Sequence, residues 1–236
     1  MRASPDLTRA TLLAGKMSKN PHTYVDCTMN RRGIVFVLSA PSGAGKTSIS
    51  KRIVAAMPDV VQVVTCTTRA PRPGERDGRE YHFLSRQAFE QRIAAGDFLE
   101  WAQFNGQLYG TLRQSVEAAT AAGKDVLLVI DVQGAAQHRA AGLDAVFVFV
   151  LPPSWEALAQ RLRARGSEST QQQEQRLLVA RQEVAHYTAY DYVVINDQLD
   201  DAVRTLQAII VAERRRITRL GMAPITTLLT AQQAKG

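Results

Sequence analysis

Short apolar runs alternate with longer stretches of helical periodicity from Gly33 onward. Five of these runs have the length and β-branched content of strands, and they lie at Ile34–Leu38, Val60–Val64, Val126–Ile130, Val146–Val150 and Tyr192–Ile195. Helical spacing recurs at about Lys46–Met57, Leu112–Ala122, Trp155–Arg165, Gln171–His186 and Asp200–Thr218. This alternation is typical of a parallel sheet with helices on its faces, so the pattern predicts an α/β fold.

The alternation is interrupted between residues 65 and 109, a segment rich in arginine, proline, glycine and aromatic side chains. Short strands are expected there near Tyr81–Phe83 and Leu99–Phe104, so the segment is interpreted as a lobe inserted into the main domain. Residues 1–31 show neither the period of a strand nor that of a helix and are expected to form a flexible N-terminal extension. Residues 217–236 are expected to be a C-terminal tail.

Two of the expected helices have boundaries that the sequence marks. The hydroxyls of Thr111 and Ser154 stand directly before Leu112 and Trp155, where a side-chain oxygen can accept from a free backbone N–H. Gly123 stands where a helix commonly ends in a left-handed residue. We therefore expect Thr111 and Ser154 to cap these two helices.

Composition and charge narrow the class of protein. Of 236 residues, 45% are hydrophobic and 22% are charged, which suits a globular domain with an apolar core. Lys and Arg number 29 against 22 Asp and Glu, and the resulting charge of +7 favours partners that carry phosphate. Charge alone would also allow a nucleic-acid-binding protein, but no recognition helix or RNA-binding pattern accompanies it, so no nucleic-acid partner is expected.

The cysteines and the longest apolar runs indicate the cellular compartment of the protein. The two cysteines, Cys27 and Cys66, match no metal-ligand spacing and argue against a disulfide framework. No apolar run approaches the roughly 20 residues of a membrane-spanning helix. We therefore expect a cytoplasmic protein with no membrane contact.

A glycine-rich turn between the first strand and the first helix carries the clearest chemistry. After Ser39 it reads Ala40, Pro41, Ser42, Gly43, Ala44, Gly45, Lys46, Thr47 and Ser48. This is a P-loop in which Ala40 replaces the first glycine. The glycines let backbone N–H groups converge on phosphate oxygens, and Lys46 would reach the β- and γ-phosphates. The Thr47 hydroxyl would bind Mg²⁺, with water and nucleotide oxygens as the other ligands.

Six further motifs follow this phosphate loop in order. They read Thr-Thr-Arg-x-Pro-Arg-Pro-Gly-Glu, Tyr-His-Phe, Phe-Leu-Glu-Trp, Tyr-Gly-Thr, Ile-Asp-Val-Gln-Gly and Val-Ile-Asn-Asp. With the phosphate loop, they resemble the guanylate kinase family over about Arg32 to Arg216. The resemblance implies a P-loop NTPase-like parallel sheet flanked by helices, with an inserted mixed α/β GMP-binding lobe and a helical lid. The implied bounds are 32–64 and 110–216 for the core, 65–109 for the lobe and about 154–187 for the lid.

The lobe is where the acceptor nucleotide would bind. Arg69 and Arg72 are separated by a proline-containing loop that can present two guanidinium groups to one phosphate monoester. The resemblance assigns these arginines, Tyr81 and Tyr109 to the phosphate of GMP. It assigns the guanine to a carboxylate that accepts from the donor edge of the base and to hydroxyls around it, at Glu100, Thr65 and Thr111.

An acidic residue follows the strand Val126–Ile130. Asp131 at the carboxyl end of a core strand can hold Mg²⁺ through water or contact the acceptor nucleotide, and the resemblance places it with GMP. The family usually has Asp-Ile-Asp here, whereas this chain has Val129-Ile130-Asp131. Val129 therefore replaces the first of the two acids, and any role of that acid in the family is not expected of this chain.

The lid resembles the family's mobile segment and carries several arginines. Arg165 and Arg176 are predicted to join Lys46 in stabilising charge on the transferred phosphoryl group. Asn196, at the end of the strand Tyr192–Ile195, matches the segment that the family places near the adenine of ATP.

The function implied by these motifs is Mg²⁺- and ATP-dependent phosphorylation of GMP, and of dGMP, in purine nucleotide metabolism. A ribose-phosphate kinase shares the phosphate loop but needs no guanine pocket, so Glu100 argues against it. A guanylate-kinase-like scaffold module typically has a degraded phosphate loop and attached interaction domains. Here Gly45, Lys46 and Thr47 are intact, which favours an enzyme. The sequence leaves the oligomeric state open.

Overall fold

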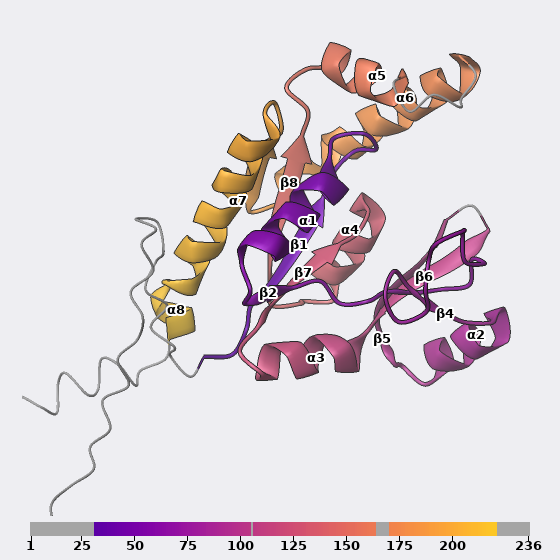
Figure 1. Ribbon diagram of the computed structural model, residues 1–236, viewed down its shortest axis with the longest axis vertical. Coiled ribbons are helices and arrows are strands. Elements are labelled where there is room, and N and C mark those ends of the chain that lie inside the picture. The colour runs from indigo at the N-terminus through magenta and orange to yellow at the C-terminus, as the bar shows by residue number, and fades with distance from the viewer. Residues whose placement is uncertain (1–30, 105, 164–169, 221–236) are drawn as a thin grey trace, which may run out of the picture.

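The computed structural model describes residues 31–104, 106–163 and 170–220. Its main sheet has five parallel strands in the order β2-β7-β1-β8-β9. Their bounds are Val60–Val61 for β2, Asp125–Val129 for β7, Val35–Ser39 for β1, Ala145–Leu151 for β8 and Tyr192–Ile195 for β9. The predicted α/β fold with a parallel sheet is thus confirmed (Figure 1).

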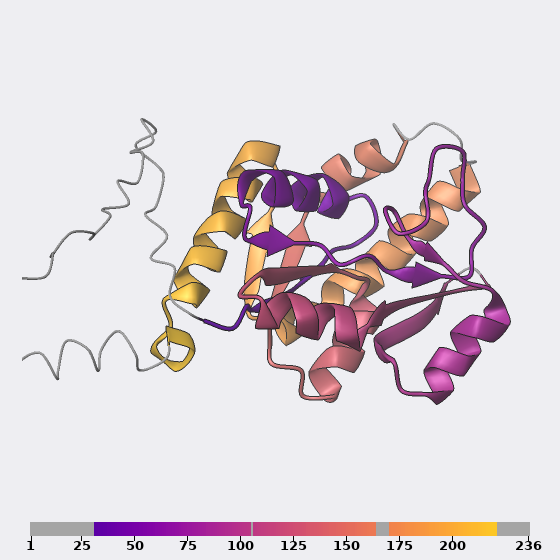
Figure 2. The same ribbon diagram turned by 60° about the horizontal axis from the view of Figure 1, so that its bottom comes forward.

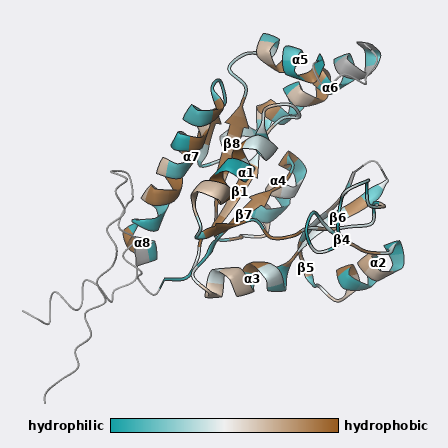
Figure 3. Cartoon of the chain, in the orientation of Figure 1, coloured by the Kyte–Doolittle hydropathy of each residue, from teal (hydrophilic) through white to brown (hydrophobic). Residues whose placement is uncertain are grey.

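Helices cover both faces of this sheet, which is why its strands are apolar at nearly every position. On one face, Phe36 and Leu38 of β1 pack with α1 (Lys46–Ala56) and α7 (Leu199–Arg214). On the other face, Val35 and Val37 pack with α3 (Arg113–Ala121) and α4 (Val132–Ala140). Figure 3 shows the resulting hydrophobic strands inside and hydrophilic helix faces outside.

A second sheet forms the lobe that the sequence predicts. It has four strands of mixed direction in the order β4-β3-β6-β5. Their bounds are His82–Phe83, Cys66–Thr67, Gln107–Leu112 and Phe98–Phe104. Helix α2 (Arg86–Ala94) packs on this sheet through Phe89, whose ring stacks on that of Phe98 with centroids 4.3 Å apart. The lobe therefore has a small apolar core of its own.

Two further helices lie at the top of Figure 1, with the lobe at its lower right, and Figure 2 shows the second of them running toward the lobe. They are α5 (Trp155–Arg163) and α6 (Thr170–Val184), and they pack through Leu158, Leu162 and Ala180. A 3-10 helix (Ala185–Ala189) returns the chain to β9, and α8 (Ile217–Leu220) follows α7. We call α5 and α6 the lid helices.

Several local predictions need correction. Thr111 does not cap α3, because its hydroxyl donates instead to the carboxylate of Glu100 at 2.7 Å. The Ser154 cap is confirmed, since the Ala157 amide donates to its hydroxyl at 3.1 Å. Helices α2 and α4 were not predicted. The sequence of α4 contains Gly134 and no apolar stripe, and its start is set by the Asp131 carboxylate, which accepts from the Gly134 amide at 2.7 Å.

Other boundaries differ by a few residues. The predicted strand at Val60–Val64 ends at Val61, and the predicted helix Asp200–Thr218 is broken between α7 and α8. Among the described residues, no helix is long and apolar enough to cross a membrane. Of the predicted extension at 1–31, residues 1–30 lie outside the described residues, as do residues 221–236 of the predicted tail at 217–236, whereas 217–220 form α8.

Candidate active site

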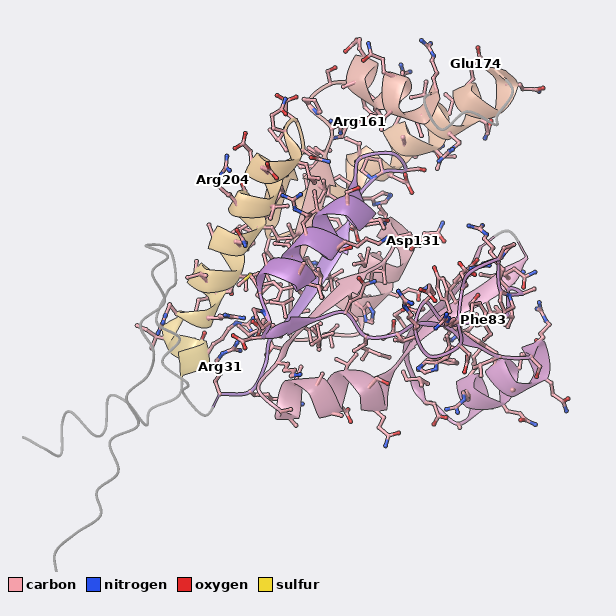
Figure 4. The ribbon with its side chains drawn as sticks, viewed as in Figure 1. Arg31, Phe83, Asp131, Arg161, Glu174 and Arg204 are labelled. Atoms are coloured by element: carbon pink, nitrogen blue, oxygen red, sulfur yellow. The ribbon has the colours of Figure 1, made fainter. Side chains whose placement is uncertain are left out.

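The predicted site residues of the core lie at the edge of the main sheet where its strands end. Because the five strands are parallel, their carboxyl ends share this edge. The phosphate loop follows β1, Asp131 follows β7 and Asn196 follows β9. Open α/β sheets bind ligands at this edge. In Figure 4, Asp131 lies between the lid helices above and the lobe around Phe83 below.

The phosphate loop has the backbone of an anion cradle. Gly43 and Gly45 have φ angles of 91° and 98°, in the left-handed region that favours glycine. The loop turns through a bond from the Ala44 amide to the Pro41 carbonyl at 3.1 Å. Helix α1 begins directly afterwards at Lys46, so its free N–H groups and positive dipole end lie at the loop.

Lys46 connects this loop to the strand beside it. Its ammonium group donates to the Ile130 carbonyl at 2.8 Å, at the end of β7. Burial lowers the pKa of Lys46, while the carboxylates of Asp131 and Glu183 oppose that shift. Thr47 and Ser48 follow in the first turn of α1 and are exposed.

The same sheet edge holds Asn196, which is buried and contacts the phosphate loop. Its side-chain amide donates to the Ala44 carbonyl at 2.7 Å. The residue is only 5% exposed. The side chain that was predicted to contact adenine therefore binds the backbone of the phosphate loop instead.

One lid helix reaches the phosphate loop at Ser42. The Arg176 guanidinium donates to the Ser42 hydroxyl at 2.6 Å. The Ser42 amide donates to a carboxylate oxygen of Glu183 at 3.3 Å. Burial raises the pKa of Glu183. Of the two predicted lid arginines, Arg176 lies at the loop, whereas Arg165 lies outside the described residues.

A second group of predicted residues forms a buried carboxylate pocket. Glu100 on β5 is 8% exposed and accepts the hydroxyl of Thr111, on the paired strand β6, at 2.7 Å. Its other oxygen and the Asp131 carboxylate both lie beside Gly134 at the start of α4. Burial raises the pKa of Glu100 to about 7, and the charge of Asp131 adds to the rise, while the Thr111 bond opposes it.

Thr65, the other predicted guanine contact, directly precedes β3 in this lobe. It is half-buried, and its carbonyl accepts from the His82 amide at 2.9 Å.

The predicted phosphate-binding side chains of the lobe form a second cluster. Tyr81 and Tyr109 meet edge to face with ring centroids 6.1 Å apart. The Arg69 guanidinium lies 5.3 Å from the centre of the Tyr81 ring. Arg72 is exposed in the loop after β3, where its amide donates to Glu75 at 2.8 Å.

Two acidic residues of this arrangement were not predicted. Arg69 donates to both carboxylate oxygens of Glu75 at 2.9 Å, and the Arg72 amide and Arg69 together hold the pKa of Glu75 below its ordinary value. Glu183 is the other. The signals were present: Glu75 ends the arginine motif, and Glu183 lies seven positions after Arg176, on the same face of α6.

Comparisons with known proteins agree with this geometry. The family model for guanylate kinase matches residues 32–213. A guanylate kinase of Symbiobacterium thermophilum is 50% identical over 198 residues, which cover 84% of this chain and 94% of that protein. One of Xanthomonas oryzae is 50% identical over 185 residues, covering 78% of this chain and 91% of that protein.

A solved structure gives the same result. The crystal structure of guanylate kinase from Anaplasma phagocytophilum superposes with a TM-score of 0.65 at 32% identity, covering 80% of this chain and 90% of that one. Because the family model matches residues 32–213 and these relatives are 50% identical over more than three quarters of the chain, the chain belongs to the guanylate kinase family.

Proposed function

We propose that this chain transfers the γ-phosphoryl group of ATP to the phosphate of GMP, giving ADP and GDP. One observation carries the proposal. Residues 130 and 131 contact both halves of the site: the Ile130 carbonyl accepts from Lys46 of the phosphate loop, and the next side chain, Asp131, lies beside Gly134 with Glu100. A donor phosphate on the loop and a guanine at Glu100 would therefore be held by one short segment.

In this proposal each half of the site binds one nucleotide. The backbone N–H groups of the phosphate loop and the Lys46 ammonium bind the donor phosphates. The ionised Glu100 accepts from the N1–H and 2-amino groups of guanine, a pattern that adenine lacks. Arg69, Arg72, Tyr81 and Tyr109 bind the phosphate of GMP, with Thr65 and Thr111 beside the base. The two phosphates are thereby oriented for in-line transfer.

The transfer itself needs no nucleophile from the protein. An oxygen of the GMP phosphate bonds to the γ-phosphorus as the bond to the bridging oxygen of ADP breaks. Charge spreads over the oxygens of the moving group, and Lys46 and Arg176 stabilise that charge, as we also propose for Arg165. An arginine in this role can contribute about 10³–10⁵ in rate.

Mg²⁺ suits the residues at the loop. Among the described residues, no cluster of three His, Cys, Asp or Glu side chains could hold a metal by itself, which fits a cation bound largely by nucleotide oxygens and water. The exposed Thr47 hydroxyl beside Lys46 would supply the protein ligand. When bound, Mg²⁺ would neutralise charge on the β- and γ-phosphates.

We also propose dGMP as an acceptor, because each contact named above is to base or phosphate. A chain that uses ATP and GMP would act in the cytoplasm, in purine nucleotide metabolism. The test is to incubate protein with ATP, GMP and Mg²⁺ and to identify the products by chromatography. ADP and GDP in equal amounts support the proposal, and their loss in Lys46→Met or with a chelator is expected. ADP without GDP would contradict it.

A further inference from the structure

The side chain of Asn196 is bonded to the backbone of the phosphate loop. Its amide nitrogen donates to the Ala44 carbonyl at 2.7 Å, although 152 positions separate the two residues. Ala44 is fully buried, so its carbonyl cannot use bulk water as a partner. A buried carbonyl without a donor costs free energy comparable to a lost hydrogen bond. Asn196 therefore supplies the hydrogen-bond donor for the inward-facing carbonyl of Ala44.

The next residue of the loop shows how closely Asn196 packs. A Cβ built on Gly45 would lie 2.1 Å from the amide nitrogen of Asn196, which is far inside van der Waals contact. Gly45 also has a φ angle of 98°. Glycine is thus required twice at this position, once by the backbone conformation and once by Asn196. The two residues form one packed unit at the start of α1.

Asn196 is itself held from two sides. Its backbone amide donates to the Leu151 carbonyl at the end of β8, at 2.7 Å. Its backbone carbonyl accepts from the Arg161 guanidinium of the lid helix α5 at 2.9 Å. The labelled Arg161 projects from α5 toward this end of the sheet in Figure 4. The end of β8 and helix α5 therefore hold the backbone of Asn196 in place. The side chain of Asn196 in turn holds the phosphate loop.

From these contacts we infer that Asn196 is a positioning residue for the donor phosphates, acting through the phosphate loop and independently of the adenine base. The bond to Ala44 orients the peptide unit between Ala44 and Gly45. The N–H of that unit lies on the opposite side from its carbonyl, so a carbonyl held by Asn196 directs the N–H toward the phosphate side. The inference rests on the proposed function only in that this loop binds phosphate.

The inference separates phosphate binding from base recognition, and a ligand without a base tests it. Tripolyphosphate offers the donor phosphates alone. Asn196→Leu keeps a similar shape without the donor or a new charge, and Asn196→Ala is a second variant should leucine disturb folding. Asp197→Ala is the matched control, because Asp197 is exposed at the same strand end. Thermal unfolding verifies that each variant is folded.

We expect both Asn196 variants to bind tripolyphosphate about ten- to a hundredfold more weakly, the loss typical of leaving a buried group unsatisfied. KM for ATP should rise by the same factor, KM for GMP should stay unchanged, and the ratio of ATP to GTP as donor should not move. Asp197→Ala should bind tripolyphosphate as the unsubstituted protein does. Unchanged tripolyphosphate affinity in the Asn196 variants overturns the inference alone, even if ATP loses its advantage over GTP. Failure of the unsubstituted protein to bind tripolyphosphate overturns the proposed function as well.

Discussion

Glu100 combines burial, one hydroxyl partner and a neighbouring acid, and under the proposed function this combination should make GMP binding depend on pH. With a pKa of about 7, the carboxyl group is only partly ionised at neutral pH in the absence of ligand. Only the ionised form accepts from both donor groups of guanine. KM for GMP should therefore fall as pH rises from about 6 to 8, by at most about tenfold per unit below the pKa. Bound GMP should displace protons.

The pH series is run on Glu100→Gln as well. The variant retains the titration of the GMP phosphate and removes only the carboxyl group at residue 100. Its KM should be higher at pH 8 and should vary less between the two pH values. The same slope in both proteins would contradict the assignment of Glu100 to guanine.

Glu75 orients Arg69 through two hydrogen bonds, so its removal should weaken phosphate binding without touching the base. We expect Glu75→Gln to raise KM for GMP severalfold, because an amide cannot keep both charge-assisted hydrogen bonds to Arg69, with KM for ATP unchanged. Glu90→Gln, on the exposed face of α2, is the matched control. Steady-state kinetics with each substrate varied in turn gives both constants. A rise in KM for ATP alone would refute this role.

Single residues were predicted with uneven success, for a physical reason. Glu100, Thr111 and Asp131 lie in sequence motifs, and the structure brings all three to Gly134 or to each other. The spacing of Glu183 from Arg176 places both on one face of α6, but the contact of Glu183 with Ser42 spans 141 positions and only the fold shows it. Asn196 was recognised as a site residue, but only the fold reveals that its amide faces the loop backbone.

Helix α6 contacts the phosphate loop, and its two arginines have different surroundings. Arg176 bonds the Ser42 hydroxyl, whereas Arg181 is exposed and lies over the ring of Trp155. Arg176→Ala should lower kcat by about 10³ or more, as for arginines that stabilise phosphoryl transfer, with KM for GMP little changed. Arg181→Ala should retain most activity. Rapid-quench measurement of the transfer step distinguishes the two, and equal losses would argue against a specific role of Arg176.

The elements of the core were predictable because their strands are continuous apolar runs, buried on both faces. Helix α2 escaped prediction because only Phe89 of its residues is buried, so it shows no apolar stripe. Helix α4 begins where Asp131 accepts from the Gly134 amide, and its buried residues are Val132, Gly134, Ala135 and His138. Neither pattern differs from that of a polar loop.

In the whole molecule, the candidate site and a buried cluster of charged residues lie at opposite ends of the strands of the main sheet. The carboxyl ends of the strands hold the site. The opposite end holds Asp125, which is fully buried and accepts from Arg31 at 2.6 Å, from Arg214 at 2.7 Å and from the Ile34 amide at 2.8 Å. These contacts connect the start of the described chain, β7 and α7. Sequence reasoning could not find them, because each joins residues about 90 positions apart.

Replacing Asp125 should therefore cost stability and spare activity. Asp125→Ala leaves two arginines beside a buried site without their carboxylate, a change that typically costs about 3–5 kcal/mol. Urea unfolding should show this loss, while kcat at low temperature should remain close to normal. Asp200→Ala, which removes an exposed partner of Arg52, should cost at most about 1 kcal/mol. Equal losses in the two variants would contradict the importance of the buried cluster.

The central claim is that this chain phosphorylates GMP and selects it through Glu100. The most direct measurement is the ratio of kcat/KM for GMP to that for AMP, in the unsubstituted protein and in Glu100→Ala. A site built for the hydrogen bonds of one base can reject another by up to roughly 10⁴, so we predict a ratio of about that size. The ratio should fall at least about a hundredfold in the variant, with KM for ATP unchanged. An unsubstituted protein that uses AMP as well as GMP, or a ratio unaltered by removing Glu100, would contradict the account.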